Sequence, residues 1–490
     1  MKLKGIFSLL VLISYFQLNA QVWTQMGGNI NGETEIEASG RRVSMSANGE
    51  TIAVAAQFND DNGTDSGIVR VYSWSGSAWL QKGSSIEGEA EFDQSGESIS
   101  LSDDGNTIAI GAPYNLVNGD VAGHTRIYLW NGSSWQQKGL DINAEGAQDR
   151  SGSSVSLSSD GNIVAIGAPY NDSTESDTGH VRVFEWNGST WLQKGIDLDG
   201  LVESDRFGFD VKLDNTGNTL AVGNPTNSNV DFLSGTTRIY DWDGSNWIQR
   251  GNDINGQNFG SQSGYSISLN DDGNIIAIGD SGTDTTTRIV RMFFWNGTTW
   301  EQKGETIAGG GDSPSNRPVS LNANGNIVAI GTGGSGAFGG QVKVYEWSGS
   351  SWVQVGTEIE CDSNTEDCRR AVVLNATGDI LAIGDPSNNG GGNSLGQVRV
   401  FTTQTLGIND NIFASAKVYP NPTSGLIHLD LFNLQDVSVK VIDTSGRLIY
   451  SEDKISSYNP TIDLIAQQSG FYFIEIFSEN KSRVYKVIKQ

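Results

Sequence analysis

Seven copies of the pattern Trp-x-Gln-x-Gly run through most of this chain and constrain its fold more than any other feature. The first five copies are spaced 56 residues apart, and the last two spacings are 53 and 52. The copies begin at Trp23, Trp79, Trp135, Trp191, Trp247, Trp300 and Trp352. A second tryptophan stands five residues before six of them, and the two series account for all 13 tryptophans. A period of this length predicts a repeat architecture in which one supersecondary unit recurs.

Each period contains four short runs that are typical of β-strands. Residues 155–158 alternate apolar and polar, residues 163–166 are continuously apolar, and residues 181–184 alternate again. The copy that begins at Trp191 is the fourth run, and Asp-Gly and Asn-Gly pairs supply tight turns. Four antiparallel strands per unit are typical of a propeller blade. The first run occurs seven times, so the chain is predicted to be all-β, with a seven-bladed β-propeller over residues 21–403.

The two ends of the repeat region complement each other. The seventh unit stops at residues 398–401 without a tryptophan pair, whereas the chain opens with an unpaired copy at residues 23–27. We expect this N-terminal strand to complete the last blade. Closing the ring in this way removes the exposed sheet edges that favour aggregation.

The loops between strands two and three, and between blades, are long and acidic and share one face of the predicted ring. Function on a scaffold usually lies on such loops. Asp172, Glu175 and Asp177 in one of them are candidate Ca²⁺ ligands. The alternative is that these carboxylates are solvated surface charge.

The sequence contains no recognisable catalytic constellation. His124 and His180 share one repeat position, which Ile68, Thr236, Gln341 and Gln397 hold in other blades, so we interpret it as a strand start and not as a ligand. No nucleophile elbow, zinc-protease helix or phosphate loop is present. A carboxylate pair on the loops would suffice for a glycosidase and remains an alternative. The recurrent arginines and tryptophans are expected to serve cross-strand pairing within each blade and blade packing.

Several segments resemble the FG-GAP repeats of integrin-α-type propellers. The matching residues are Gly167-Ala168-Pro169 with the strand 179–184, and Gly111-Ala112-Pro113 repeats the first of them. The resemblance implies the propeller fold. Ca²⁺-binding repeats of that family carry an Asp-rich loop between strands one and two, where this chain has only the short turn 158–161.

The N-terminus predicts export. Lys2 and Lys4 precede a mostly apolar stretch over residues 6–16, and Ala20 offers a small residue for cleavage, as in a signal peptide of residues 1–20. No other stretch is long and apolar enough to cross a bilayer.

In an oxidising compartment, a disulfide between Cys361 and Cys368 is expected. The net charge of −26 disfavours nucleic-acid partners.

The last residues, 413–490, break the period and follow a linker at 404–412. Their strand-like runs predict a small β-sandwich. The segment resembles the C-terminal sorting domain of type IX secretion cargo in Bacteroidetes. The residues that carry this resemblance are Tyr419, Pro420, Asn421, Pro422, Gly425, Gly446, Gly470 and Tyr472. It implies the type IX secretion machinery as a partner and a secreted or cell-surface location; a generic accessory β-domain is the alternative.

Together these features predict a binding or adhesion propeller whose long-looped face takes a glycan or protein ligand, with no cofactor apart from the candidate Ca²⁺. A glycan hydrolase and a structural surface component are the alternatives. An aromatic or apolar patch among the long loops would favour the binding module. A few irregular polar residues converging at the channel mouth would favour the enzyme.

Overall fold

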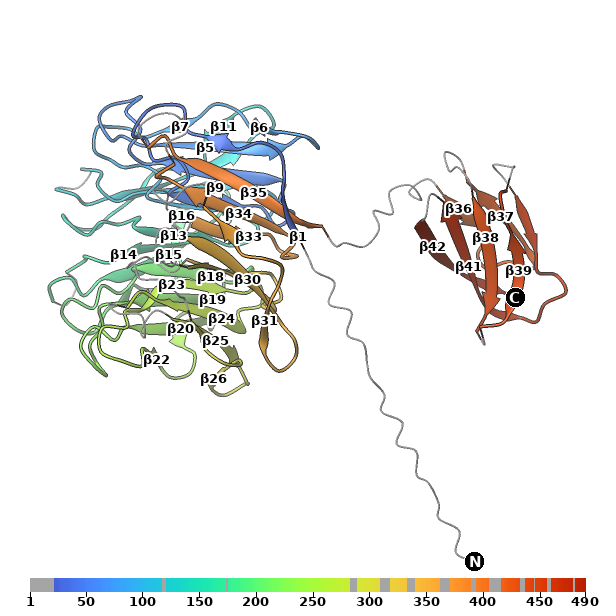
Figure 1. The fold of residues 1–490 in the computed structure, drawn as a ribbon. Helices are drawn as coiled ribbons and strands as arrows, with labels where there is room; N and C mark the ends of the chain where they lie inside the picture. Colours follow the sequence, from blue (N-terminus) through green and yellow to red (C-terminus); the bar gives the residue numbers. More distant parts are fainter. Residues whose placement is uncertain are drawn as a thin grey trace, which may run out of the picture. The chain divides into compact units, whose positions relative to one another are not determined.

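The computed structural model divides into two compact units, Trp23–Thr403 and a second that contains Gln404–Gln490 (Figure 1). The residues that the structure describes are 22–116, 120–172, 175–282, 289–308, 318–332, 340–361, 371–388, 394–404, 416–431, 437–444, 446–455, 460–478 and 481–490. The predicted leader and nearly all of the predicted linker lie outside them. Among the described residues no helix is long and apolar enough to cross a membrane.

The first unit contains seven five-stranded antiparallel sheets, which are the blades of a β-propeller. In each blade, strands one to four follow in order, and a short fifth strand pairs with the third beside the fourth. The strands of blade 1 are β3 (Arg42–Met45), β4 (Thr51–Ala56), β5 (Ile68–Trp74), β6 (Trp79–Gln81) and β7 (Ile86–Glu87). Those of blade 2 are β8 (Ser98–Leu101), β9 (Thr107–Ala112), β10 (His124–Trp130), β11 (Trp135–Gln137) and β12 (Ile142–Asn143). Those of blade 3 are β13 (Ser154–Leu157), β14 (Ile163–Ala168), β15 (His180–Trp186), β16 (Trp191–Gln193) and β17 (Leu198–Asp199). Those of blade 4 are β18 (Asp210–Leu213), β19 (Thr219–Asn224), β20 (Thr236–Trp242), β21 (Trp247–Gln249) and β22 (Ile254–Asn255).

Blades 5 to 7 repeat the same order. The strands of blade 5 are β23 (Ser263–Leu269), β24 (Ile275–Asp280), β25 (Ile289–Trp295), β26 (Trp300–Gln302) and β27 (Ile307–Ala308). Those of blade 6 are β28 (Val319–Leu321), β29 (Ile327–Thr332), β30 (Gln341–Trp347), β31 (Trp352–Gln354) and β32 (Ile359–Glu360). Blade 7 combines β33 (Ala371–Leu374), β34 (Ile380–Asp385) and β35 (Gln397–Gln404) with β1 (Val22–Gln25) and β2 (Ile30–Asn31) from the N-terminus.

The pairing of β1 and β2 with β35 closes the ring, as the sequence predicted (Figure 1). Ile30 lies opposite Val398, and the Met26 amide donates to the Val400 carbonyl over 2.7 Å. Trp23 is buried in a core cluster together with strands of blades 6 and 7. The last blade therefore depends on the N-terminal strand for its outer edge.

A ring of backbone hydrogen bonds joins the turns between strands one and two of all seven blades. The amide of one turn donates to the carbonyl of the equivalent turn in the next blade, over 2.9–3.1 Å. The residues in this ring are Ala47, Asp103, Ser159, Asn215, Asp271, Ala323 and Ala376, whose amide donates back to Ala47. The closed cycle fixes the radius of the propeller on this face.

The Trp-x-Gln-x-Gly motif clamps neighbouring blades together at six of the seven blade junctions. The Trp135 indole nitrogen of blade 2 donates to the Lys82 carbonyl of blade 1 over 2.8 Å. The Lys82 ammonium lies 5.5 Å from the ring centroids of Trp130 and Trp135 and donates to the Gly105 carbonyl. The paired indoles lie 5.2–5.5 Å apart in six blades. The tryptophans thus pack blades together, as expected, and the repeat motif is an interblade device.

The recurrent arginines correct one prediction. Arg126 of blade 2 donates to the Glu87 carbonyl of blade 1 over 2.8 Å, and Arg182 donates to the Asn143 carbonyl of blade 2. Pairing within a blade is therefore wrong for these residues, because the long side chain reaches past its own sheet. Arg238 retains an intrablade partner, Asp253.

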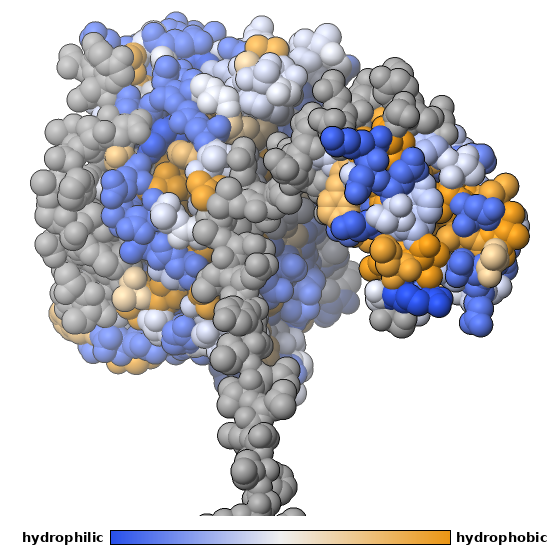
Figure 2. All heavy atoms as spheres, turned by 45° about the vertical axis from the view of Figure 1, so that its right-hand side comes forward, coloured by the Kyte–Doolittle hydropathy of each residue, from blue (hydrophilic) through white to orange (hydrophobic). Residues whose placement is uncertain are grey.

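The second unit is a small two-sheet β-domain, as predicted. One sheet contains β36 (Lys417–Tyr419), β37 (Leu426–Asp430) and β40 (Thr461–Asp463). The other contains β39 (Leu448–Glu452), β38 (Ser438–Asp443), β41 (Gly470–Ser478) and β42 (Lys481–Lys489). Alternate residues of both sheets build one apolar core that includes Ile427, Val439 and Ile474. Figure 2 shows apolar side chains on the surface of this unit, and the exposed ones include Leu426, Leu448, Phe471, Val484 and Ile488.

Candidate functional site

The first strands of the blades line a cavity of about 400 Å³ along the propeller axis. Its serine hydroxyls join neighbouring blades. Ser44 accepts from the Leu101 amide and Ser100 from the Leu157 amide, each over 2.9 Å. These hydroxyls are therefore part of the framework of the ring.

A second cavity of about 360 Å³ lies at the mouth of the channel on the long-looped face. We call this cavity the aromatic mouth. Its residues come from the starts of the loops after the second strands and from the ends of the loops between blades. The residues that line it include Arg41, Arg42, Phe58, Tyr114, Arg150, Tyr170 and Phe209.

Arginines stack on the aromatic rings of the mouth. The Arg150 guanidinium carbon lies 4.2 Å from the Tyr170 ring centroid and 5.1 Å from that of Tyr114. The Arg206 guanidinium carbon lies 4.8 Å from the Tyr170 ring centroid, and that of Arg41 lies 5.6 Å from the Phe58 ring centroid. A stacked guanidinium keeps its hydrogen-bond donors in the plane, where they suit carboxylate or sulfate groups. All of these side chains are half-buried.

The aromatic mouth departs from the repeat. Phe58, Tyr114 and Tyr170 hold equivalent positions in blades 1 to 3, whereas blade 4 has Thr226 there. Arg150 takes a left-handed backbone conformation with φ 52°, as do the residues at the same repeat position in other blades. Framework residues recur in every blade, whereas this aromatic set is confined to blades 1 to 3.

The carboxylates of the channel region are held by neighbouring groups. Glu97 lies 3.1 Å from the Arg42 guanidinium. Asp210 accepts from the Ile267 amide over 2.8 Å and lies 3.0 Å from the Lys212 ammonium. Both acids therefore have a structural role in the framework around the axis.

At the opposite end of the channel, Asp103 and Asp271 lie on the ring of turns. Burial raises the pKa of the Asp103 carboxyl, and adjacent Asp104 raises it further. Burial also raises the pKa of Asp271, and the charge of Asp103 adds to that rise. The backbone ring brings these like charges together, and the side-chain amide of Asn215 donates to the Asp103 carboxylate over 3.3 Å.

The predicted Ca²⁺ residues hold a turn. The Asp172 carboxylate accepts from the Asp177 amide over 2.8 Å, and Glu175 is exposed. Among the described residues, the acidic and imidazole groups that lie close enough to share a metal ion are two other sets.

Cys361 is disulfide-bonded, but Cys368 lies outside the described residues, so their pairing stays a prediction.

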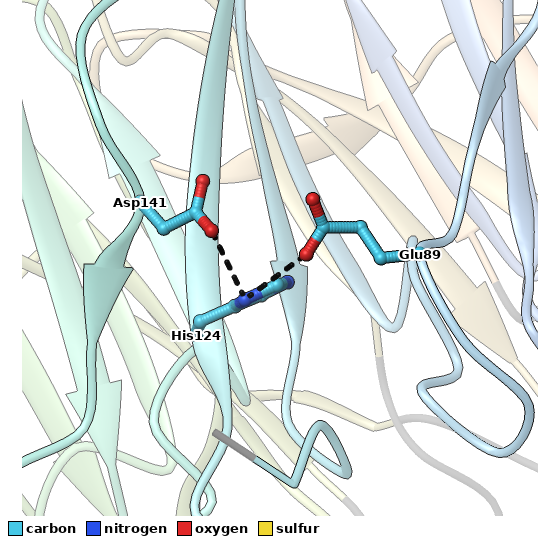
Figure 3. A group of neighbouring side chains, drawn as sticks. All are labelled: Glu89, His124 and Asp141. Atoms are coloured by element: carbon cyan, nitrogen blue, oxygen red, sulfur yellow. Dashed lines mark ion pairs between the residues drawn. The ribbon is translucent and has the colours of Figure 1, made fainter. Parts of the chain in front are cut away.

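The two possible metal-binding sets contain His124 and His180, which the sequence predicted to be strand starts and not ligands. His124 lies between Glu89 and Asp141 (Figure 3), and His180 lies beside Glu145 and Asp197. Burial lowers the pKa of His124 to about 4, and the charge of Arg126 contributes to this shift, so the imidazole is neutral at pH 7. The sequence pattern does not reveal these groups, because one carboxylate of each comes from the preceding blade.

The sorting-motif residues anchor the last strand of the second unit. The Asn421 side-chain amide donates to the Lys486 carbonyl over 2.8 Å, and its oxygen accepts from the Ile488 amide. Tyr472 is buried, and its hydroxyl donates to the Gln468 carbonyl. Gly425 has no room for a side chain, because a Cβ atom would lie 2.7 Å from Ile465. Tyr419 is half exposed.

Comparison with known proteins identifies the second unit. Residues 417–490 match the family described as the secretion system C-terminal sorting domain. No curated protein sequence matches the chain. Hydrazine synthase of Kuenenia stuttgartiensis is 11% identical, with a TM-score of 0.48, over 80% of this chain and 99% of that one. The β-propeller domain of the Trilobed protease from Pyrococcus furiosus is 11% identical, with a TM-score of 0.40, over 70% of this chain and 90% of that one.

The fold and the family match together define an exported β-propeller protein that carries a sorting domain for type IX secretion. Such a domain interacts with the type IX secretion machinery and indicates a cell-surface or secreted location. The structural matches have low identity, so the function of the propeller rests on its own side chains.

Proposed function

We propose that the propeller is an extracellular binding module that takes an acidic glycan at the aromatic mouth. Tyrosine and phenylalanine rings suit the apolar faces of sugar rings, and arginines suit carboxylate or sulfate substituents. The resemblance to FG-GAP repeats supports an adhesive role, and delivery by type IX secretion would expose the module to such ligands.

Two arginine side chains that stack on Tyr170 carry the proposal, because neither is paired with an acid among the described residues. The net charge of the chain is −26, yet among the described residues neither Arg150 nor Arg206 has a carboxylate partner within ion-pair distance. Both guanidinium groups stack on Tyr170, which restricts their movement before any ligand arrives. Preorganised donors of this kind reduce the entropic cost of binding.

The exposed apolar side chains of the long loops agree with the binding proposal. Phe232 and Phe259 have ring centroids 5.5 Å apart, and each is more than half exposed. Ile36 is 62% exposed and has φ 71°, which is an uncommon backbone conformation for a β-branched residue. An exposed aromatic pair on the long loops supports the proposal of a binding module.

The test measures binding of the purified full chain to polygalacturonate, alginate and chondroitin sulfate, with neutral xylan and laminarin for comparison. We expect binding to at least one acidic polymer and weaker binding of the neutral polymers. Each lost charge-assisted hydrogen bond is worth about 1.5–3 kcal/mol, so Arg150→Ala should weaken binding by about 10- to 100-fold. Tyr170→Ala should also weaken it, because both guanidinium groups lose their support.

Arg447→Ala is the matched control, because it removes an exposed arginine that pairs with Asp443 in the sorting domain. Affinity should be unchanged in this variant. Equal binding of acidic and neutral polymers, or unchanged affinity in Arg150→Ala, would contradict the proposal. Release of new sugar ends during incubation would instead identify a hydrolase. Loss of binding in EDTA would show that ligand binding depends on Ca²⁺.

A further inference from the structure

Two side-chain clusters with the same construction lie in successive blades, away from the aromatic mouth. The blade-2 cluster contains Glu89, His124 and Asp141, and the blade-3 cluster contains Glu145, His180 and Asp197. In each, the histidine begins the third strand, one acid precedes the short fifth strand of the same blade, and the other acid follows the fifth strand of the preceding blade. The ligand atoms within a cluster all lie within 4.8 Å of one another.

We propose that each cluster binds one divalent transition-metal ion of the zinc type. An imidazole nitrogen with two carboxylate oxygens is a donor set that suits zinc and similar ions, whereas Ca²⁺ and Mg²⁺ prefer oxygen donors alone. A bound ion would join two blades, since its ligands come from both.

The imidazole of the blade-2 cluster is buried and faces the two acids without a hydrogen bond. His124 is 0% exposed, and neither ring nitrogen has a hydrogen-bond partner among the described residues. Its Nδ1 atom lies 3.9 Å from both Glu89 Oε2 and Asp141 Oδ2 (Figure 3). His180 repeats this state, with Nδ1 lying 3.9 Å from Glu145 Oε2.

The spacing favours an ion over a direct contact. A histidine held by a carboxylate would lie at the hydrogen-bond distance of about 2.7–3.2 Å. Two ligands of one tetrahedral zinc ion, each about 2.0–2.2 Å from it, lie about 3.4 Å apart. The observed 3.9 Å is nearer to that separation than to a hydrogen bond, and the partly exposed acids can approach by a few tenths of an ångström.

Protein donors hold the far oxygen of each acid, so the near oxygen points at the imidazole. In the blade-2 cluster, the Gln137 side chain donates to Asp141 Oδ1, and the Arg126 guanidinium lies 3.4 Å from Glu89 Oε1. In the blade-3 cluster, Gln193 donates to Asp197 Oδ1, and Arg182 lies 3.6 Å from Glu145 Oε1. Such outer contacts orient metal ligands in known sites.

Blade 4 supplies the comparison within the same molecule. Thr236 holds the histidine position, and Asp253 holds the position of Asp141. There the acid turns to Arg238, whose Nε lies 3.1 Å from both of its oxygens. The acid is thus aimed at the imidazole in the two blades that have a histidine and at the arginine in blade 4, which distinguishes a ligand set from a routine ion pair.

The experiment measures metal content of the purified full chain after equilibration with excess Zn²⁺ and exhaustive dialysis. We expect two equivalents of zinc per chain, one in each of the single variants Glu89→Gln and Glu145→Gln, and none in the double variant. Gln137→Ala should retain the site but weaken it by about 10- to 100-fold. Asp253→Asn is the matched control and should retain both ions.

A second measurement follows metal binding directly and does not depend on how much zinc survives dialysis. Cobalt(II) titration should give visible absorption that saturates at two equivalents and is halved in Glu89→Gln. Because Glu89 and Glu145 are more than 40% exposed, their replacement by glutamine leaves the buried core intact. The proposal is overturned if the chain retains no zinc, if Asp253→Asn loses as much as Glu89→Gln, or if the double variant still holds two ions.

Discussion

The interblade clamp predicts a difference between two tryptophans that are equally buried. Trp247 is 7% exposed, and its indole nitrogen donates to the Lys194 carbonyl over 2.9 Å. Trp23 of the closing strand is 8% exposed, but its indole nitrogen has no hydrogen-bond acceptor among the described residues. The preceding blade has Val355 at the position where five of the seven repeats carry a lysine or arginine, so the closure seam also lacks the cation contact.

Replacing each tryptophan with phenylalanine therefore has unequal consequences. Trp247→Phe loses a hydrogen bond worth about 0.5–1.5 kcal/mol and weakens the cation–π contact with Lys194 by roughly 0.5 kcal/mol. Trp23→Phe removes an unpaired buried donor, whose burial costs about 1–3 kcal/mol, so part of its lost packing is offset. We expect Trp247→Phe to destabilise the propeller by about 2–5 kcal/mol more than Trp23→Phe.

The assay is equilibrium unfolding in guanidinium chloride followed by far-UV circular dichroism, which does not depend on the tryptophan signal. The midpoint should fall further for Trp247→Phe than for Trp23→Phe, with the same slope in both variants. Equal midpoints, or a larger loss for Trp23→Phe, would refute the assignment of the clamp as a source of stability.

Three further predictions concern closure, export and a buried acid. Deleting residues 21–28 should destabilise the ring by about 3–5 kcal/mol, because the buried Trp23 is lost with its strand, and an unchanged melting temperature would contradict the closure. Deleting residues 413–490 should retain the protein in the periplasm, and its normal appearance at the cell surface on fractionation would refute the role of the sorting domain. Burial raises the pKa of Asp280 to about 6 against the opposing charge of Arg291, so the folded state binds this proton more tightly than the unfolded state. The free energy of unfolding should therefore fall as pH rises from about 4 to about 6. Asp280→Asn should gain stability relative to wild type at pH 7 but not at pH 4, and an equal difference at both pH values would exclude this effect.

The fold follows from the sequence because its determinants are local and repeated. Each strand is specified by a short alternating or apolar run, and each turn by a pair such as Asp160-Gly161, where the glycine has φ +66°. The repeat period then fixes the number of units, and the orphan strand at Trp23 fixes how the ring closes. The sorting domain was likewise predictable from a few motif residues.

The candidate sites were less predictable, because their residues come from different blades. Tyr114, Tyr170 and Arg150 are visible in the sequence only as departures from the repeat, and a comparison of the repeats at each position would have singled them out. Arg126 and Arg182 were assigned to the wrong partners for a similar reason, since the sequence does not show how far a side chain reaches beyond its own sheet.

The sequence by itself determined the repeat, the blades, the closing strand and the sorting domain. Only the tertiary structure decided which side chains meet. His124 occupies a position that other blades fill with isoleucine, threonine or glutamine, so its residue type alone gave no reason to expect a ligand. Packing blade 1 against blade 2 brings Glu89 to that histidine, and this contact depends on the ring geometry that all seven blades define together.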